Sequence, residues 1–285
     1  MIQQTRDEHG QPVVDVRTAS VAGRLHLHGA TLVDWTPRGH APVLFLSSRA
    51  RFDGQTPIRG GVPICLPWFG ATPADPKLPA DAPGHGWARS TRWQLEHSGV
   101  SREEVLLGLR LQRDGLDVRY GVMLGHTLKL VLEVENVGPD ARRVEAALHT
   151  YFAVSDARGV EVTGLEDAAY LDKIDGGTRK PATGMPIRFA GETDRVYGAT
   201  QNAVTLHDPG GEAVPARRIV VAKEGGASTV VWNPWAEKAA RMDDFGDDEW
   251  TRMCCIESAA VGDDAWTLTA GETRTLAAEI SVTRG

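Results

Sequence analysis

Residues Thr127–Glu135, TLKLVLEVE, alternate between apolar and polar side chains. The apolar side holds Leu128, Leu130, Leu132 and Val134, and the polar side holds Lys129, Glu133 and Glu135, with Val131 as the exception. Successive side chains of a β-strand point to opposite faces, so this pattern predicts a strand with one buried face.

The same two-residue period recurs along the chain. Thr273–Val282 places four apolar side chains on one face: Leu276, Ala278, Ile280 and Val282. Shorter candidate strands are Arg24–His28, Val43–Leu46, Val105–Gln112, Arg143–Phe152, Ala203–His207, Arg218–Ala222, Ser228–Trp232 and Arg252–Glu257. Many short strands separated by Gly, Pro, Asn and Asp are typical of antiparallel sheets, which must stack or close to hide their apolar faces. We predict an all-β fold, a large antiparallel β-sandwich that forms a single domain over residues 1–285.

Helical and loop signals are few. Asn233-Pro234 can begin one short helix that runs to about Asp243, because asparagine caps free amides and proline suits the first helical position. Two stretches are predicted to be long loops, Ala71–Gly86 and Leu171–Asn202. The first carries Pro73, Pro76, Pro79 and Pro83, which excludes a central strand. Long ordered loops on a rigid scaffold often carry binding groups.

The composition excludes several classes of protein. With 285 residues, of which 41% are hydrophobic, the chain can bury a substantial core. A net charge of −7 gives no support to nucleic-acid binding, so an anionic substrate would need a local basic pocket. Cys65, Cys254 and Cys255 show no CxxC spacing, which argues against a disulfide scaffold and a cysteine zinc site. Without an evident signal peptide or a membrane-length apolar run, we expect a cytoplasmic monomer with no membrane partner.

Two titratable residues on predicted strands are candidates for proton transfer. His149 lies on the face of its strand opposite Leu148, and a histidine on a rigid strand suits acid–base chemistry near neutral pH. Glu257 ends an otherwise apolar strand, and partial burial would raise its pKa and make it a better base. A hydrogen-bonded structural histidine and a salt-bridged strand end remain the alternatives.

Two arginines lie in glycine-rich stretches. Arg59 precedes paired glycines, which would let the backbone approach a ligand, and Arg89 follows a Gly-His-Gly-Trp stretch that contains His85. Two arginines on nearby loops could fork onto a phosphate, although each alone is more often a surface ion pair.

Weaker signals are assigned no function. His26 and His28 lie two apart on a strand without a third metal ligand, and we expect them on a solvated face. The acidic run Asp243–Glu249 lacks the ligand spacing of an EF-hand and is expected to be a solvated loop. Of the eight tryptophans, most are expected in the core and one or two against a sugar ring.

Taken together and in order, the motifs resemble the hexose-6-phosphate epimerase branch of the aldose 1-epimerase, or galactose mutarotase-like, superfamily. The motifs are Ile58–Pro63, His85–Arg89, Leu148–Phe152, Asp194–Tyr197, Val231–Trp235 with Glu237-Lys238, Asp244–Asp248 and Cys255–Glu257. The resemblance implies a β-supersandwich with a sugar site on its concave face, His149 and Glu257 as the catalytic pair, and substrate contacts from Arg59, His85, Arg89 and Asp194. Many relatives carry a glutamine before the loop histidine, where this chain has Gly84.

The expected reaction is the exchange of α and β anomers of a hexose 6-phosphate, and the ligand is a small-molecule sugar phosphate. Glu257 would take the proton of the C1 hydroxyl while protonated His149 protonates the ring oxygen, so no metal or organic cofactor is required. Three other possibilities stay open: a mutarotase for unphosphorylated aldoses, a non-catalytic sugar-phosphate-binding protein, and an interaction module without a sugar site.

Overall fold

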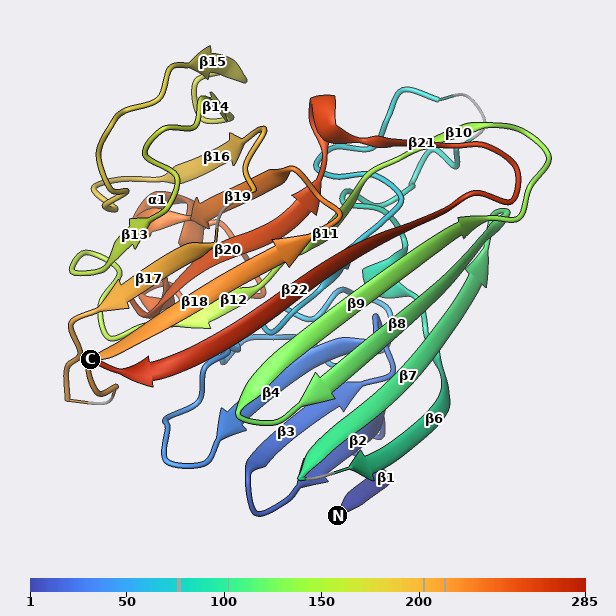
Figure 1. Cartoon of the computed structure of the whole chain (residues 1–285), viewed down its shortest axis with the longest axis horizontal. Helices are drawn as coiled ribbons and strands as arrows, with labels where there is room; N and C mark the ends of the chain where they lie inside the picture. Colours follow the sequence, from blue (N-terminus) through green and yellow to red (C-terminus); the bar gives the residue numbers. More distant parts are fainter. Residues whose placement is uncertain (76–77, 102, 202, 213) are drawn as a thin grey trace.

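Antiparallel strands make up most of the computed structural model, which describes all residues except 76–77, 102, 202 and 213. One eight-stranded sheet has the order β13-β17-β18-β22-β9-β8-β7-β6. Its strands are β13 (Glu161–Thr163), β17 (Val204–Asp208), β18 (Arg217–Glu224), β22 (Thr273–Arg284), β9 (Thr127–Asn136), β8 (Leu116–Leu124), β7 (Glu104–Arg113) and β6 (Gln94–Ser101). Figure 1 shows its long strands running side by side across the molecule.

The two alternating runs that predict this fold are neighbours in that sheet. In β9 and β22, Leu128 pairs with Ile280, and Leu132 pairs with Leu276. The apolar faces of the two strands therefore coincide, and all four side chains are fully buried in the main core. The predicted antiparallel β-sandwich is confirmed; the single domain over residues 1–285 stays a prediction.

A second eight-stranded sheet carries the candidate site. Seven of its strands follow the order β15-β14-β16-β19-β20-β11-β5, and β12 also pairs with β20. They are β15 (Thr178–Lys180), β14 (Tyr170–Asp172), β16 (Thr193–Tyr197), β19 (Ser228–Asn233), β20 (Met253–Ala260), β11 (Ala146–Leu148), β5 (Ile64–Cys65) and β12 (Tyr151–Ala153). Along β20, Cys254 and Ile256 enter the main core, whereas Cys255 packs with Tyr151 and Trp232 on the other face.

Smaller elements complete the described structure. A four-stranded sheet contains β1 (Ile2–Arg6), β2 (Pro12–Arg17), β3 (Val21–His26) and β4 (Thr31–Pro37), and β10 (Arg142–Val144) pairs with β21 (Trp266–Leu268). The helices are α1 (Trp235–Ala239), η1 (Ala88–Ser90), η2 (Glu249–Arg252) and η3 (Gly262–Asp264). None of the helices in the described residues is long and apolar enough to cross a membrane.

Several predicted elements differ from the structure. The helix is shorter than predicted, although the side-chain oxygen of Asn233 does accept the N–H of Trp235 at 2.8 Å. Val43–Leu46 makes only isolated bridges, at Leu44 and Leu46. The predicted loop Leu171–Asn202 is wrong in part, because it contains β15, β16 and the end of β14. The described part of Ala71–Gly86 has no strand; Pro76, Lys77 and Asn202 lie outside the described residues.

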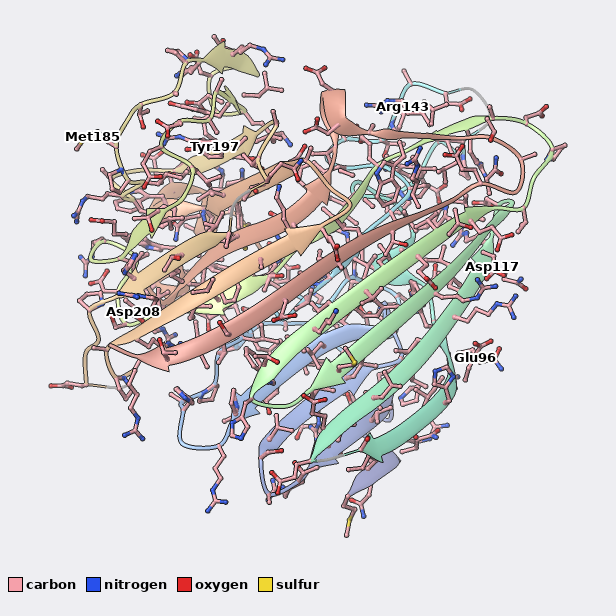
Figure 2. The ribbon with its side chains drawn as sticks, viewed as in Figure 1. Glu96, Asp117, Arg143, Met185, Tyr197 and Asp208 are labelled. Carbon is pink, nitrogen blue, oxygen red and sulfur yellow. The ribbon has the colours of Figure 1, made fainter. Side chains whose placement is uncertain are left out.

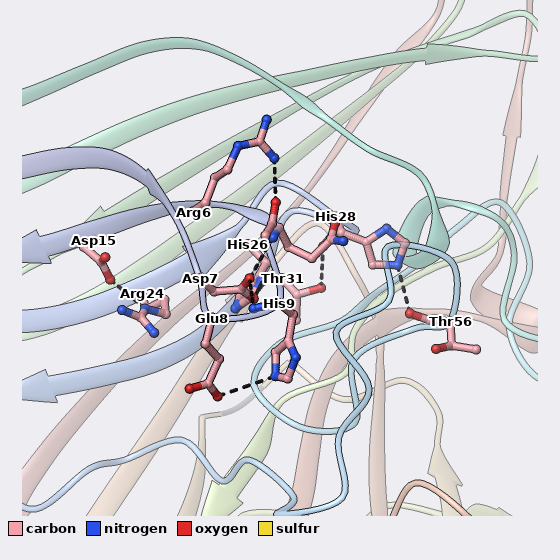
Figure 3. Close-up of polar contacts among 12 residues, drawn as sticks. Arg6, Asp7, Glu8, His9, Asp15, Arg24, His26, His28, Thr31 and Thr56 are labelled. Atoms are coloured by element: carbon pink, nitrogen blue, oxygen red, sulfur yellow. Dashed lines mark hydrogen bonds and ion pairs between the residues drawn. The ribbon is translucent and has the colours of Figure 1, made fainter.

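The expectation that His26 and His28 face solvent is wrong. Their exposed fractions are 2% and 3%, because His26 packs against the Phe52 ring at 4.9 Å and His28 Nε2 lies 2.9 Å from the carbonyl oxygen of Thr56. Nδ1 of His26 lies 3.8 Å from Oδ2 of Asp7 (Figure 3).

The acidic run Asp243–Glu249 is also not wholly solvated. Glu249 is 4% exposed and accepts hydrogen bonds from the Ser47 hydroxyl at 2.7 Å and from the N–H groups of Ser48 and Gly246, each at 2.9 Å. Elsewhere, Arg110 and Arg217 hold the buried carboxylates of Asp117 and Asp208, which lie at opposite sides of the view in Figure 2. Each of these three buried carboxylates, Glu249, Asp117 and Asp208, therefore has a hydrogen-bonding or charged partner.

Candidate active site

The register of β20 brings His149 and Glu257 together. Leu148 pairs with Ser258, and Tyr151 pairs with Cys255. The same register places His149 opposite Glu257, where the predicted strand Arg143–Phe152 is interrupted between β11 and β12. At this interruption the N–H of His149 donates to the carbonyl of Pro63 at 3.0 Å. Cross-strand partners share a face, so the two side chains meet, with Nδ1 of His149 3.3 Å from Oε1 of Glu257.

Both side chains are buried. His149 is 6% exposed and Glu257 is 1% exposed. Within the described residues, neither Nδ1 of His149 nor either carboxylate oxygen of Glu257 has a hydrogen-bond partner. Buried polar groups are nearly always hydrogen-bonded, and a group left without a partner costs free energy. Two such groups facing each other therefore form a strong candidate for a reactive site.

Burial changes the acid–base properties of this pair. It raises the pKa of Glu257 well above its usual value, and the nearby Asp194 carboxylate adds to this effect while Lys173 and Arg89 oppose it. Burial lowers the pKa of His149 well below its usual value, and His85, Arg89 and Arg59 act in the same direction. Each group is therefore favoured in its neutral form.

Aromatic rings fix the orientation of the imidazole. The ring of Tyr151 stacks on His149 with centroids 4.7 Å apart and planes 11° apart, and Trp232 meets it edge-on at 5.9 Å. Sequence analysis did not identify Tyr151 as a site residue, although it lies inside the quoted motif Leu148–Phe152. Trp232 also borders the site, and the stacking of a tryptophan on a sugar ring stays a prediction.

Arg59 is held beside this pair. Its Nη1 donates to the hydroxyl of Tyr151 at 3.0 Å, and its Nε donates to Oδ1 of Asp244 at 3.2 Å. Nη2 lies 3.1 Å from the other oxygen of Asp244. Asp244, from the run expected to be solvated, thus orients an arginine instead. The guanidinium is fixed toward the imidazole side of the site.

The loop that contains His85 and Arg89 forms another wall. Nδ1 of His85 accepts the N–H of Gly70 at 3.3 Å, and its ring lies 5.9 Å from that of His149. Burial lowers the pKa of His85 to about 3, with further contributions from Arg89, Lys173 and Arg59. Neutral His85 that accepts at Nδ1 carries its proton on Nε2, which leaves that N–H to donate to a ligand.

Arg89 retains donor capacity. Its Nη2 donates to the carbonyl of Gly84 at 3.0 Å, whereas its buried Nε has no hydrogen-bond partner among the described residues. Gly84 lies close to the start of its own loop, because a Cβ atom there would meet the carbonyl oxygen of Gly70 at 3.2 Å. The chain therefore makes a tight backbone contact at position 84.

Lys173 is a third cation that sequence analysis missed. Its Nζ lies 4.9 Å from the centroid of the Phe69 ring, and the side chain is exposed at the rim of the site. Its positive charge opposes the rise in the pKa of both Glu257 and Asp194, so Lys173 lies near these two carboxyl groups. The only signal in the sequence is its position just after β14, within a stretch that was predicted to be a loop.

Asp194 lies on β16, on the same face as the pair. It pairs with Trp232 of β19, and Trp232 pairs with Cys255 of β20, so these side chains share one surface of the sheet. Burial raises the pKa of Asp194, and nearby Lys173 and Lys238 oppose that increase. The structure therefore gathers all six predicted site residues around one face.

The interpretation of the paired glycines needs correction. Gly60 and Gly61 have φ values of 123° and 65°. Cβ atoms there would meet the carbonyl oxygens of Phe45 at 2.5 Å and Leu32 at 2.1 Å. The glycines allow close backbone packing within the protein, and this packing positions Arg59.

A separate hollow of about 440 Å³ contains none of the predicted site residues. It is bordered by Tyr170, Val196, Ser228 and Asp263. Its one arginine, Arg179, is already paired with Asp263 at 2.6 Å. The chemical grouping on the face of β20 is therefore the better candidate for an active site.

Comparisons with known proteins identify the family to which the chain is similar. The profile of the family described as "Aldose 1-epimerase" matches residues 16–281. A protein of Cenchrus ciliaris is 36% identical over 255 residues, which cover 83% of this chain and 74% of that protein. A protein of Escherichia coli K12 is 32% identical over 238 residues, which cover 82% and 78% of the two chains. Both bear the name "Putative glucose-6-phosphate 1-epimerase".

A solved structure has the same fold. The crystal structure described as that of a "putative mutarotase" from Salmonella typhimurium superposes with a TM-score of 0.87 and 27% sequence identity. The match covers 100% of this chain and 97% of that one.

Proposed function

The chain belongs to the aldose 1-epimerase family, and from this premise we propose that it interconverts the α and β anomers of a hexose 6-phosphate, D-glucose 6-phosphate in the first instance. The observation that carries the proposal is the 3.3 Å approach of two buried groups without hydrogen-bond partners, His149 Nδ1 and Glu257 Oε1. Anomer exchange needs one proton acceptor and one proton donor at the same place, and this pair supplies both.

Ring opening then moves two protons in concert. Glu257 accepts the proton of the C1 hydroxyl, and protonated His149 donates its proton to the ring oxygen as the bond between C1 and that oxygen breaks. The open aldehyde rotates about the C1–C2 bond. On closure the ring hydroxyl returns its proton to His149 and Glu257 protonates the aldehyde oxygen, which yields the other anomer.

The pKa shifts bear on the two protonation states of this cycle. A carboxylate with an imidazolium and a carboxylic acid with a neutral imidazole contain the same number of protons. Burial favours the neutral form of both Glu257 and His149, as their raised and lowered pKa values indicate. In the proposed cycle that neutral pair is the state reached after ring opening, and the ionised pair, which burial disfavours, must form before ring opening.

Arg59 and Arg89 are proposed to bind the phosphate, and Asp194 and His85 the sugar hydroxyls. Two features support this role: the unpaired Nε of Arg89 and the fixed guanidinium of Arg59. Lys173 adds a cation at the rim. Names of the relatives in Cenchrus ciliaris and Escherichia coli point to the same phosphorylated substrate. We further propose a cytoplasmic monomer.

The test follows the decay of pure α-glucose 6-phosphate toward equilibrium. Glu257→Gln removes the proton acceptor while keeping the shape of the side chain, and the acceleration should fall by about 10²- to 10⁴-fold. The matched control is Glu279→Gln, an exposed glutamate on β22, which should behave as wild type. An undiminished rate in Glu257→Gln would refute the assignment.

The same assay run with glucose separates the alternatives. Arg89→Ala should weaken the reaction of glucose 6-phosphate much more than that of glucose, because a charge-assisted hydrogen bond contributes about 1.5–3 kcal/mol. Arg92→Ala, the exposed arginine three positions on, is the control. Equal rates for both sugars would favour a mutarotase of unphosphorylated aldoses, and saturable binding without acceleration would favour a non-catalytic protein.

A further inference from the structure

A buried thiol lies beside the proposed catalytic pair and has no part in the proposed proton transfers. Cys255 and Glu257 are two residues apart on β20, so they share a face, and Cys255 is directly opposite Tyr151 in the neighbouring strand. One ligand atom from each of His149, Cys255 and Glu257 lies within 4.8 Å of the other two. All three residues are buried, with exposed fractions of 6%, 0% and 1%.

The geometry is close to that of a metal site. Zinc binds donors at about 2.0–2.3 Å, so the donors of a tetrahedral site lie roughly 3.3–3.6 Å apart. Nδ1 of His149 and Oε1 of Glu257 already lie 3.3 Å apart. The sulfur of Cys255 lies within 4.8 Å of both atoms and would have to move closer to them to complete a face of the tetrahedron.

The donors themselves indicate the class of ion. Nδ1 of His149 and both carboxylate oxygens of Glu257 have no hydrogen-bond partner within the described residues, so no hydrogen bond to them has to break before an ion binds. A set of one sulfur, one nitrogen and one oxygen suits a borderline-soft ion such as Zn²⁺, whereas Mg²⁺ and Ca²⁺ prefer oxygen donors alone. Three protein ligands also leave the fourth position open to water or to a sugar hydroxyl.

We propose that His149, Cys255 and Glu257 form a binding site for Zn²⁺ and related soft divalent ions, which inhibit the enzyme by occupying the two groups that exchange protons with the sugar. Binding displaces the thiol proton of Cys255, and any proton on Glu257, into solvent. The inhibitory half of the proposal rests on the proposed function, whereas the binding half does not.

Neighbouring cysteines provide the matched variants. Cys254 is the adjacent residue and is equally buried, but it enters the main core on the opposite face of β20. Cys255→Ala therefore removes a proposed ligand, and Cys254→Ala removes a thiol of the same burial without touching the site. Thermal unfolding of both variants, without metal, checks that each is folded.

Metal binding is measured first without sugar, by calorimetric titration of the full chain with Zn²⁺ and by the visible absorption of Co²⁺ at a thiolate site. Wild type and Cys254→Ala should bind one ion, and Cys255→Ala should bind at least about tenfold more weakly and lose the thiolate absorption. Equal Zn²⁺ affinity in Cys255→Ala and wild type would overturn the site, as would an equally strong response to Mg²⁺.

Inhibition is measured next, with α-glucose 6-phosphate. Zn²⁺ should slow wild type and Cys254→Ala reversibly, with activity restored by EDTA, and Cys255→Ala should keep its turnover at Zn²⁺ concentrations that stop the wild type. Binding that depends on Cys255 in a protein without anomerase activity would refute the proposed function and leave the metal site standing. Anomerase activity that Zn²⁺ does not affect would refute the inhibition alone.

Discussion

Two histidine–carboxylate pairs are buried in the part of the chain that the structure describes, and they differ in how the carboxylate is held. His149 faces Glu257 at 3.3 Å, and His26 faces Asp7 at 3.8 Å. Oδ1 of Asp7 accepts the N–H groups of His9 at 3.0 Å and Gln11 at 2.7 Å, which ties the carboxylate into the turn between β1 and β2.

No comparable hydrogen bond holds Glu257, whose two carboxylate oxygens lack partners within the described residues. The surroundings differ as well. The positive charges of Arg59 and Arg89 lower the pKa of His149. Arg24 lowers the pKa of His26 in the same way, but it also donates a hydrogen bond to Asp15 at 2.6 Å (Figure 3). His26 and Asp7 also line a hollow of about 350 Å³. Burial and proximity are shared, and so is the lack of a hydrogen-bond partner on the facing atoms, since Oδ2 of Asp7 and Nδ1 of His26 also have none within the described residues. The pairs differ in the second carboxylate oxygen, which accepts two hydrogen bonds in Asp7 and none in Glu257.

Exchanging each histidine for glutamine gives the largest expected contrast. His149→Gln cannot protonate the ring oxygen, so anomerisation of α-glucose 6-phosphate should slow by about 10²- to 10⁴-fold. His26→Gln should leave that rate unchanged, because the four-stranded sheet supplies none of the predicted site residues. A comparable loss of rate in both variants would remove the distinction between the pairs.

The second prediction concerns stability in acid. Burial lowers the pKa of His26 from 6.5 to about 4; Asp7 opposes this shift, and Arg24 and His28 add to it. Between these pH values the unfolded chain binds a proton that the folded chain does not. Stability from this residue is therefore complete above pH 6.5 and falls as the pH drops toward 4, by roughly 3 kcal/mol in total.

Urea unfolding at pH 7 and pH 4.5 measures this effect. His26→Gln should show a smaller loss of unfolding free energy on acidification than wild type, and His126→Gln, at an exposed position, should retain the full loss. An identical pH dependence in His26→Gln and wild type would contradict the assignment.

The smallest effect is expected from Asp7→Ala. The backbone N–H groups of His9 and Gln11 lose their acceptor, and the unfolding free energy should fall by about 1–3 kcal/mol without a change in catalytic rate. Glu8→Ala, at an exposed neighbouring position, is the control. A loss of rate at unchanged stability would instead mark Asp7 as part of a functional site.

Much of the fold could be predicted from the sequence, because one-sided burial imposes a two-residue period on each strand. That period located β9 and β22 within one or two residues of their observed ends. It failed for short strands such as β15, whose residues are half-buried or exposed, and β16, whose buried residues do not alternate with exposed ones. It also placed His26 and His28 in solvent, since alternation alone does not reveal that Phe52 covers one of them.

The fold class, the family resemblance and six candidate site residues could all be assigned from local pattern and ordered motifs in the sequence. It left both His149 and Glu257 with structural alternatives, because a residue's neighbours across a sheet are not written in its own strand. The folded sheet shows that the register of β20 places these two residues opposite each other, with Cys255 beside them and no hydrogen bond to the carboxylate from the described residues. Register and burial are properties of the assembled sheet, and they give this pair its shifted pKa values and its proposed chemistry.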